Sequence, residues 1–204
     1  MRSSSDATAG PRLSAALLLV LLGGFLGGCG TLLHAAPPAL PRPGAVSRAP
    51  EGEGRFLAFV GPAIQHASPY LDVSGTNFYT LRSWLDRRTG ETAHQLYVTD
   101  SYAGAERNWN AARDERGAPL RFIAISKNEI TCEGGCAYDE EFAAALPDSV
   151  MRAHGEGLAV TFTARSGAEK TIAVAGDLMK KQLAAVDAAR AGVPVAAATP
   201  PAGR

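Results

Sequence analysis

Two pairs of β-rich segments, each divided by a short turn, constrain the fold of this chain most strongly. The first pair is "TNFYTLRSWLD" and "TAHQLYVTDSY", around the turn "RRTGE" that contains Gly90. The second pair is "GLAVTFTAR" and "EKTIAVA", around "SGA". Aromatic and β-branched arms on either side of a glycine-containing turn predict β-hairpins.

Further segments between these hairpins also indicate strands. "RFLAFVG" is a short apolar run that ends at a Gly-Pro pair, and "APLRFIAISKNEITC" is typical of a strand. "AYDEEFAAAL" is ambiguous, because its alanines favour helix whereas its position after a tight turn favours strand. Asp148 can cap a short helix that runs to His154 and stops at Gly155.

The last regular segment is predicted to be an amphipathic helix. It begins at Asp177 with "DLMKKQLAAVDAAR", and Gly192 follows it. Its imperfect apolar stripe consists of Leu178, Met179, Gln182, Leu183 and Val186. Consecutive hairpins with a terminal helix predict an α+β fold, in which the helix covers one face of an antiparallel β-sheet. A β-sandwich-like core is the alternative.

The first 28 residues have the features of an export signal. Basic residues precede the apolar run "LSAALLLVLLGGFL", whose length of about 14 residues falls short of the roughly 20 that a membrane-spanning helix needs. The run leads into "LGGC" (26–29), which resembles a bacterial lipobox. In signals of that kind the peptidase cuts before the cysteine, whose thiol receives a diacylglycerol. We therefore expect residues 1–28 to be a lipoprotein signal peptide and Cys29 to be lipidated.

A lipidated Cys29 implies that covalent lipid holds the protein at a membrane. Each buried methylene contributes about 0.8 kcal/mol, so two or three acyl chains hold firmly. Gly30, rather than aspartate, follows the cysteine. By resemblance to Gram-negative lipoproteins this indicates the outer membrane, on its periplasmic side. A secreted protein cut near Gly28 and an uncleaved anchor are the alternatives.

Composition divides the remainder of the chain. We expect residues 29–54 to combine the lipidated cysteine with a proline-rich tether, residues 55–190 to form one domain, and residues 191–204 to be a disordered tail of low complexity. Without residues 1–28 the net charge is −1, and no basic run occurs. Because nucleic-acid binding depends on neutralising phosphates, we expect no nucleic-acid partner.

Cys132 and Cys136 enclose the loop Glu133-Gly134-Gly135. Such a loop joins two strands well and places the flanking cysteines at a Cα separation that a disulfide accepts. Export supplies an oxidising compartment, and lipidation of Cys29 accounts for the odd third cysteine. We predict a Cys132–Cys136 disulfide that contributes on the order of 2 kcal/mol, because the loop is so short.

The same C-x3-C spacing is also compatible with a metal or thiol-exchange site. Copper-delivery proteins of the Sco type use it together with a distal histidine, and soft metals favour thiolate and imidazole ligands. The weak alternative is therefore a site that combines Cys132 and Cys136 with His94 and His154. Apart from this alternative, we expect no metal and no cofactor other than the lipid on Cys29.

Acidic and aromatic groups supply two further candidates. The run Asp139–Glu141 can bind a cation or act as a carboxylate pair, although we favour a solvated strand edge. Aromatic residues at strand positions can line a ligand groove but are more often core. These residues are Tyr79, Trp84, Tyr97, Tyr102 and Trp109. The chain contains no HExxH, GxSxG, phosphate-binding or dinucleotide-binding motif.

The stretch from Phe78 to about Val186 resembles a group of uncharacterised proteobacterial lipoproteins. The resemblance rests on "LRSWLDRRTG" with "HQLYV", on "FIAIS" before Cys132 and Cys136, and on the closing hairpin and helix. It covers about half of the chain. It implies a location in the envelope and a fold, but no catalytic residue.

These observations favour a lipid-anchored, periplasm-facing protein with a non-enzymatic role in binding, assembly or scaffolding, whose partner would be an envelope protein. The alternative is a periplasmic copper or thiol-exchange protein that uses Cys132 and Cys136. A carrier of a small ligand in an aromatic-lined cleft is a third hypothesis.

Overall fold

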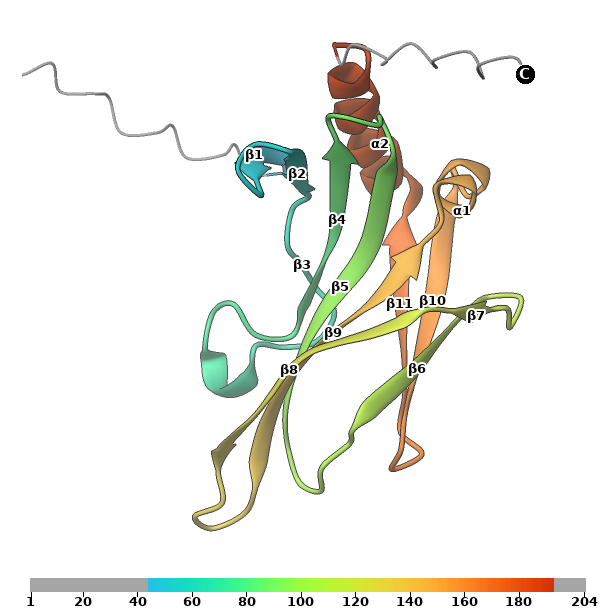
Figure 1. The fold of residues 1–204 in the computed structure, drawn as a ribbon. Coiled ribbons are helices and arrows are strands. Elements are labelled where there is room, and N and C mark those ends of the chain that lie inside the picture. Colours follow the sequence, from blue (N-terminus) through green and yellow to red (C-terminus); the bar gives the residue numbers. More distant parts are fainter. Residues whose placement is uncertain (1–43, 193–204) are drawn as a thin grey trace, which may run out of the picture. The chain divides into compact units, whose positions relative to one another are not determined.

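The computed structural model describes residues 44–192 (Figure 1). The predicted signal peptide, Cys29, most of the predicted tether and the tail from residue 193 lie outside the described residues. No helix among the described residues is long and apolar enough to cross a membrane.

The described chain forms two antiparallel sheets, two α-helices and one short 3-10 helix. The strands are β1 Ser47–Glu51, β2 Phe56–Val60, β3 Ile64–Gln65, β4 Phe78–Asp86, β5 Thr92–Ala103, β6 Trp109–Asp114, β7 Pro119–Leu120, β8 Phe122–Thr131, β9 Ala137–Leu146, β10 Gly157–Ala164 and β11 Glu169–Ala175. The helices are η1 Tyr70–Asp72, α1 Asp148–Ala153 and α2 Gly176–Arg190.

Three segments of the described chain link the two sheets, and the shortest lies between β7 and β8. The larger sheet has the strand order β1-β2-β4-β5-β9-β8, with β3 beside β4, and the smaller has the order β11-β10-β6-β7. Only Arg121 separates β7 in the smaller sheet from β8 in the larger one. The carbonyl of Arg121 accepts a hydrogen bond from the amide of Ala145 at 2.9 Å. The chain therefore passes from one sheet directly into the other.

The main core lies between the two sheets and the helices. Its buried side chains include Leu96, Val98 and Phe142 from the larger sheet, Val160, Phe162 and Ile172 from the smaller sheet, and Met151 and Met179 from the helices. Phe142 and Phe162 pack edge to face, with ring centroids 4.9 Å apart. The predicted α+β class is confirmed, and the facing sheets also give it the sandwich-like character of the alternative.

Both predicted hairpins are present, as β4–β5 and β10–β11. In the first, Asp86 holds the turn, because its Oδ1 accepts the amide hydrogen of Arg88 at 2.8 Å. Its Oδ2 accepts two hydrogen bonds from Arg55, at 2.6 and 2.9 Å. Gly90 takes the left-handed conformation, with φ +74°, which glycine adopts without strain.

The ambiguous segment 137–146 is the strand β9. It pairs with β5 on one side and with β8 on the other. Phe142, Ala144 and Leu146 alternate into the main core, as side chains on one face of a strand do. Tertiary pairing therefore overrides the helix preference of its alanines.

The C-terminal helix is confirmed, with α2 beginning at Gly176. Met179, Gln182 and Val186 are buried, whereas Leu178 and Leu183 of the predicted stripe are half-buried. The short helix α1 is also present, but the prediction that Asp148 caps it is wrong. Pro147 occupies the cap position, and Asp148 lies in the first turn, where its carboxylate accepts hydrogen bonds from other side chains instead.

The predicted tether extends too far, because β1 lies within residues 29–54. Ser47 pairs with Val60 and Glu51 pairs with Phe56, so this segment belongs to the larger sheet. Its composition misled the prediction, since backbone pairing does not need large apolar side chains. Pro50 is tolerated because β1 is the edge strand of the sheet.

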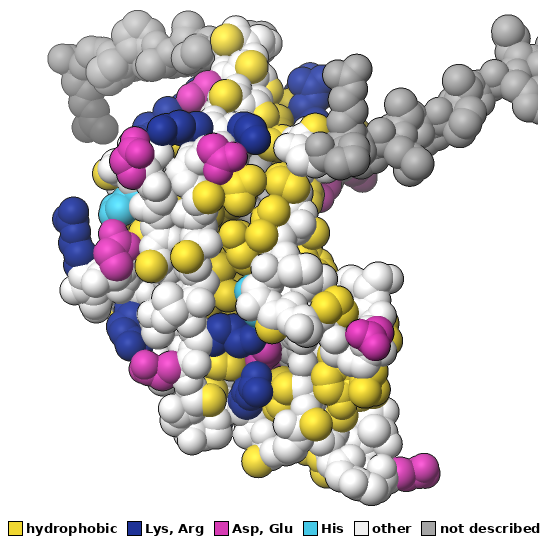
Figure 2. All heavy atoms as spheres, turned by 180° about the vertical axis from the view of Figure 1, so that it is seen from behind, with side chains coloured by type: hydrophobic (Ala, Val, Ile, Leu, Met, Phe, Trp, Pro, Cys, Tyr) yellow, Lys and Arg dark blue, Asp and Glu magenta, His cyan; other side chains and the backbone are white. Residues whose placement is uncertain are grey.

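Figure 2 shows the molecule from behind, with Lys and Arg side chains interspersed among Asp and Glu. Hydrophobic side chains gather between these charged groups toward the middle of this face. A mixed surface of this kind does not create a strong field of one sign.

Candidate binding groove

A groove opens where β6 and β8 diverge. At one end β7 bridges them, because Ala112 and Arg113 of β6 pair with Leu120 and Pro119. Figure 1 shows β6 and β8 spreading apart from β7. Beyond that point β8 pairs only with β9, and β6 pairs only with β10. Two strand edges therefore face the same opening, which we call the β6–β8 groove.

The groove encloses a cavity of about 490 Å³, within the range of pockets that hold small ligands. Its apolar lining comes from Trp109, Phe122, Ile125 and Phe142, and its polar lining includes Asn108, Asn110, Ser126, Lys127, Glu140 and Arg165. The arrangement combines an apolar floor with convergent polar groups, as binding sites commonly do.

The carboxylate of Glu140 holds the wall of the groove in place. Glu140 is 5% exposed, and its Oε1 accepts hydrogen bonds from the hydroxyl of Tyr102 and, at 3.0 Å, from the amide of Asn108. Its Oε2 accepts the amide hydrogen of Trp109 at 3.1 Å. Burial, followed by this hydrogen bond to Glu140, raises the pKa of Tyr102. Glu140 thus fixes the segment that enters β6.

Asp100 fixes the same segment from the side of β5. Its Oδ2 accepts hydrogen bonds from Arg107 at 2.7 Å and from the indole of Trp109 at 2.9 Å. Its Oδ1 lies 2.5 Å from Nζ of Lys170 on β11. Burial alone would raise the pKa of Asp100, but the hydrogen bonds and charges of Lys170 and Arg107 outweigh it and lower that pKa. The Lys170 contact also links the two sheets.

The prediction of a solvated acidic edge at 139–141 is wrong, because β9 is an inner strand between β5 and β8. Glu140 faces the groove, whereas Asp139 accepts a hydrogen bond from Ser101 at 2.5 Å. Glu141 interacts with Tyr97, whose pKa rises to about 12 through burial and then through this contact. The three carboxylates thus have different partners, although Glu141 also lines the groove.

The aromatic residues that the sequence suggested for a ligand groove do not all lie at the β6–β8 groove. Trp109 lines the β6–β8 groove, and Tyr102 supports it through Glu140. Tyr79 belongs to the main core. Trp84 lies elsewhere, with its indole bound to Glu51 at 2.8 Å.

Cys132 and Cys136 form a disulfide with a Cα–Cα distance of 3.9 Å. The bond closes the tip of the β8–β9 hairpin, as predicted. The structure does not bring His94 to this tip. His94 pairs with Leu146, whereas the disulfide adjoins Ala137 at the other end of β9, about 30 Å away at the rise of a strand.

His154 does not approach the disulfide cysteines either, because it follows α1 and lies 2.9 Å from Glu115 through Nε2. No group of three metal-ligating side chains suited to an ion occurs within residues 44–192. The four residues of the weak metal alternative therefore do not converge.

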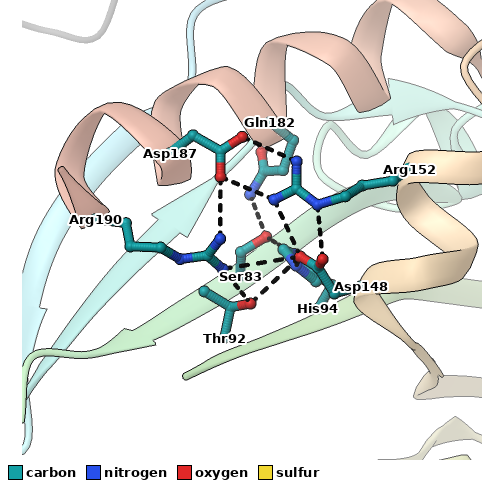
Figure 3. Close-up of polar contacts among 8 residues, drawn as sticks. All are labelled: Ser83, Thr92, His94, Asp148, Arg152, Gln182, Asp187 and Arg190. Atoms are coloured by element: carbon teal, nitrogen blue, oxygen red, sulfur yellow. Dashed lines mark hydrogen bonds and ion pairs between the residues drawn. The ribbon is translucent and has the colours of Figure 1, made fainter. Parts of the chain in front are cut away.

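A second polar cluster joins the helices to the larger sheet (Figure 3). Nε2 of Gln182 donates to the hydroxyl of Ser83 at 2.9 Å, and Ser83 Oγ lies 2.7 Å from Nδ1 of His94. Nε2 of His94 lies 3.1 Å from Asp148, which also binds Arg152 at 2.7 Å. Because Asp148 accepts from Nε2, His94 carries its proton there and accepts at Nδ1 from Ser83.

Ser83, His94 and Asp148 are the residue types of a hydrolase triad, but their setting differs. Ser83 is completely buried beneath Gln182, and His94 is 2% exposed, so a substrate cannot reach the hydroxyl in this conformation. Burial lowers the pKa of His94 despite the hydrogen bond to Asp148. We interpret the cluster as a hydrogen-bonded link between β4, β5, α1 and α2, in which burial favours the neutral form of His94.

Sequence reasoning missed Asp100 and Lys170, and it did not predict that Ser83, His94 and Asp148 come together. Glu140 lay within the candidate run Asp139–Glu141, but its role in holding the groove wall was not predicted. Their partners lie far apart in the chain, so no local motif marks them. Comparisons with protein-family models, with curated proteins and with solved structures found no match for this chain.

Proposed function

We propose that this protein is a lipid-anchored domain of the cell envelope that binds a partner in the β6–β8 groove and does not catalyse a reaction. The observation that carries the proposal is the cavity of about 490 Å³ between two strand edges. The nearby carboxylates of Asp100 and Glu140 already accept hydrogen bonds from fixed donors. Such groups stabilise the wall and are poorly placed to act as acid or base.

The proposed anchor rests on the sequence "LGGC", which ends at Cys29. Together with Gly30 it supports attachment to the outer membrane on its periplasmic side. A protein that faces the periplasm from a membrane anchor meets other envelope proteins, and we propose one of them as the partner.

Metabolic labelling with a palmitate analogue tests the anchor. The full chain should incorporate the label and fractionate with membranes, whereas Cys29→Ser should do neither. Cys132→Ser with Cys136→Ser is the matched control and should keep both properties. Equal membrane association of the full chain and Cys29→Ser would contradict the anchor.

A photo-crosslinking residue placed at Ile125 in the anchored protein tests the groove. Ile125 lines the groove and is 43% exposed, and Val60, which is 37% exposed, provides a control outside it. The proposal predicts discrete crosslinked products in cells from position 125 and none from position 60. Equal crosslinking at the two positions, or none at 125, would contradict binding in the groove.

A further inference from the structure

The chemistry of the groove walls points to the kind of molecule that the groove accepts. β8 is the last strand of the larger sheet, and the stretch 109–111 of β6 lacks a partner on the side toward β8. A strand edge presents backbone donors and acceptors at the spacing of another strand. An extended peptide satisfies these groups by pairing with the edge, which is a recurrent mode of peptide recognition.

Two bulges set the length of edge that is open to regular pairing. The register between β8 and β9 shifts between Ala124 and Ser126, and again between Glu129 and Thr131. Bulges restrict open-ended pairing at sheet edges and re-aim side chains. Here Ile125 lies at the first bulge and lines the groove. The regular stretch between the bulges, 126–129, fits a short segment rather than a long strand.

The charges at the groove favour an acidic segment. Arg165 is exposed at the rim and makes no ion pair among residues 44–192. Lys127, the other basic side chain in the lining, is bound to Glu106. The oxygens of Glu140 are already occupied by three donors. Glu141, the other acidic side chain in the lining, is half-buried and contacts Tyr97. Arg165 is thus the exposed charge of the lining that lacks a counterpart among residues 44–192, and a carboxylate would complement it.

We infer that the β6–β8 groove binds a short extended peptide segment that adds as a strand to residues 126–129 of β8 and places a carboxylate side chain against Arg165. The inference rests on the proposed function, because it names the chemistry of the partner at that groove. The backbone of the peptide would form hydrogen bonds with the edge of β8, and Ile125 and Phe122 would contact the apolar side chains of the peptide. Arg165 would favour a peptide with a negatively charged side chain.

Tryptophan fluorescence measures such binding directly. The chain has two tryptophans, so Trp84→Phe leaves Trp109 in the groove as the reporter. The full chain with this change is titrated in detergent with capped hexapeptides of alternating Val and Thr. Their central residue is Glu, Gln or Lys, and a fourth peptide carries Pro beside the central Glu.

The Glu peptide should bind most tightly, with the Gln peptide weaker by about fivefold, the upper range for one exposed ion pair. Arg165→Gln should remove this preference, whereas Arg48→Gln, on the distant strand β1, should keep it. The Pro peptide should lose binding because it lacks a backbone donor. Equal affinities for the Glu, Lys and Pro peptides, or no binding of any peptide, would overturn the inference.

Two further outcomes separate this inference from its rivals. Failure of every peptide together with crosslinking at Ile125 would leave the groove as a binding site but refute the peptide. Self-association of the chain that Lys127→Glu abolishes would identify a second copy as the occupant and would also refute it. Absence of specific crosslinking at Ile125 would refute the proposed function itself.

Discussion

At the scale of single residues, buried carboxylates decide the shape of the groove. Glu140 holds the amides of Asn108 and Trp109, and Asn108 adopts a φ of +58° where the chain turns into β6. Asparagine tolerates this conformation better than most residues. The carboxylate and the turn therefore place Trp109 against the groove.

Replacing Glu140 by glutamine should destabilise the protein. Its carboxylate accepts three hydrogen bonds. In Glu140→Gln the side-chain NH2 group would face hydrogen-bond donors that it cannot accept from. We expect Glu140→Gln to lower the free energy of unfolding by about 2 kcal/mol, as measured by urea denaturation. Glu129→Gln, at an exposed position of β8, is the control and should change it by less than about 0.5 kcal/mol. Equal effects would contradict this role of Glu140.

His94 makes stability depend on pH. Burial lowers its pKa below the 6.5 expected in the unfolded chain, so the unfolded state binds more protons as the pH falls through this range. Stability should therefore decrease from about pH 7.5 to about pH 5. The pKa of Asp148 is lowered below 3.8 by Arg152, so its contribution disappears only at more acid pH.

Urea denaturation across this range checks the role of His94. His94→Gln should reduce the loss of stability on acidification, and His66, whose pKa burial also lowers, should account for part of what remains. An unchanged slope in His94→Gln, or a wild-type protein that gains stability on acidification, would contradict the assignment.

At the scale of elements, α2 begins in close contact with the turn after α1. An added Cβ at Gly176 would lie 2.2 Å from the carbonyl oxygen of Gly155 and 2.7 Å from the carbonyl carbon of Glu156. Both neighbours are backbone atoms, which cannot rotate away. This contact requires glycine at the start of the helix.

Gly176→Ala should therefore lower the free energy of unfolding by about 2 kcal/mol or more, with a matching fall in the thermal midpoint. Gly192→Ala is the control at the other end of the helix, where the added Cβ would meet only the carbonyl oxygen of Ala189, at 3.6 Å. A fully tolerated Gly176→Ala would show that the helix shifts easily against α1.

The β8–β9 hairpin is closed by the Cys132–Cys136 disulfide. Because it closes a very short loop, replacing both cysteines by serine should cost no more than about 2 kcal/mol. Thiol counting on the native full chain should find the bond resistant to mild reductant. Rapid reduction, or tight Cu(I) binding that Cys136→Ser abolishes, would instead support the copper or thiol-exchange alternative.

At the scale of the whole molecule, local patterns predicted the hairpins and the terminal helix because their signals lie within short windows. β4–β5, β10–β11 and α2 are examples. The passage from β7 to β8 at Arg121 was not predictable, since no local pattern specifies which sheet a strand joins. β1 was missed because its side chains are almost all exposed, so its sequence lacks the apolar alternation that marks a strand.

The candidate site was less predictable than the fold. Trp109 was among the candidate groove aromatics, but its carboxylate partners were not identified. Asp100 and Lys170 are 70 residues apart in the chain, and Glu140 lies 31 residues from Trp109. Such contacts arise only when the sheets come together. The cysteine spacing was informative because both partners lie in one turn.

Amide hydrogen exchange tests the central claim of a binding groove between β6 and β8 most directly. The full chain is compared in native membranes and after purification in detergent. If the groove is occupied in the envelope, the amides of β6 and β8 should exchange more slowly in membranes, while those of β1, the opposite edge of the larger sheet, should not change. Equal exchange of β8 in both preparations, or protection at β1 instead, would contradict the account.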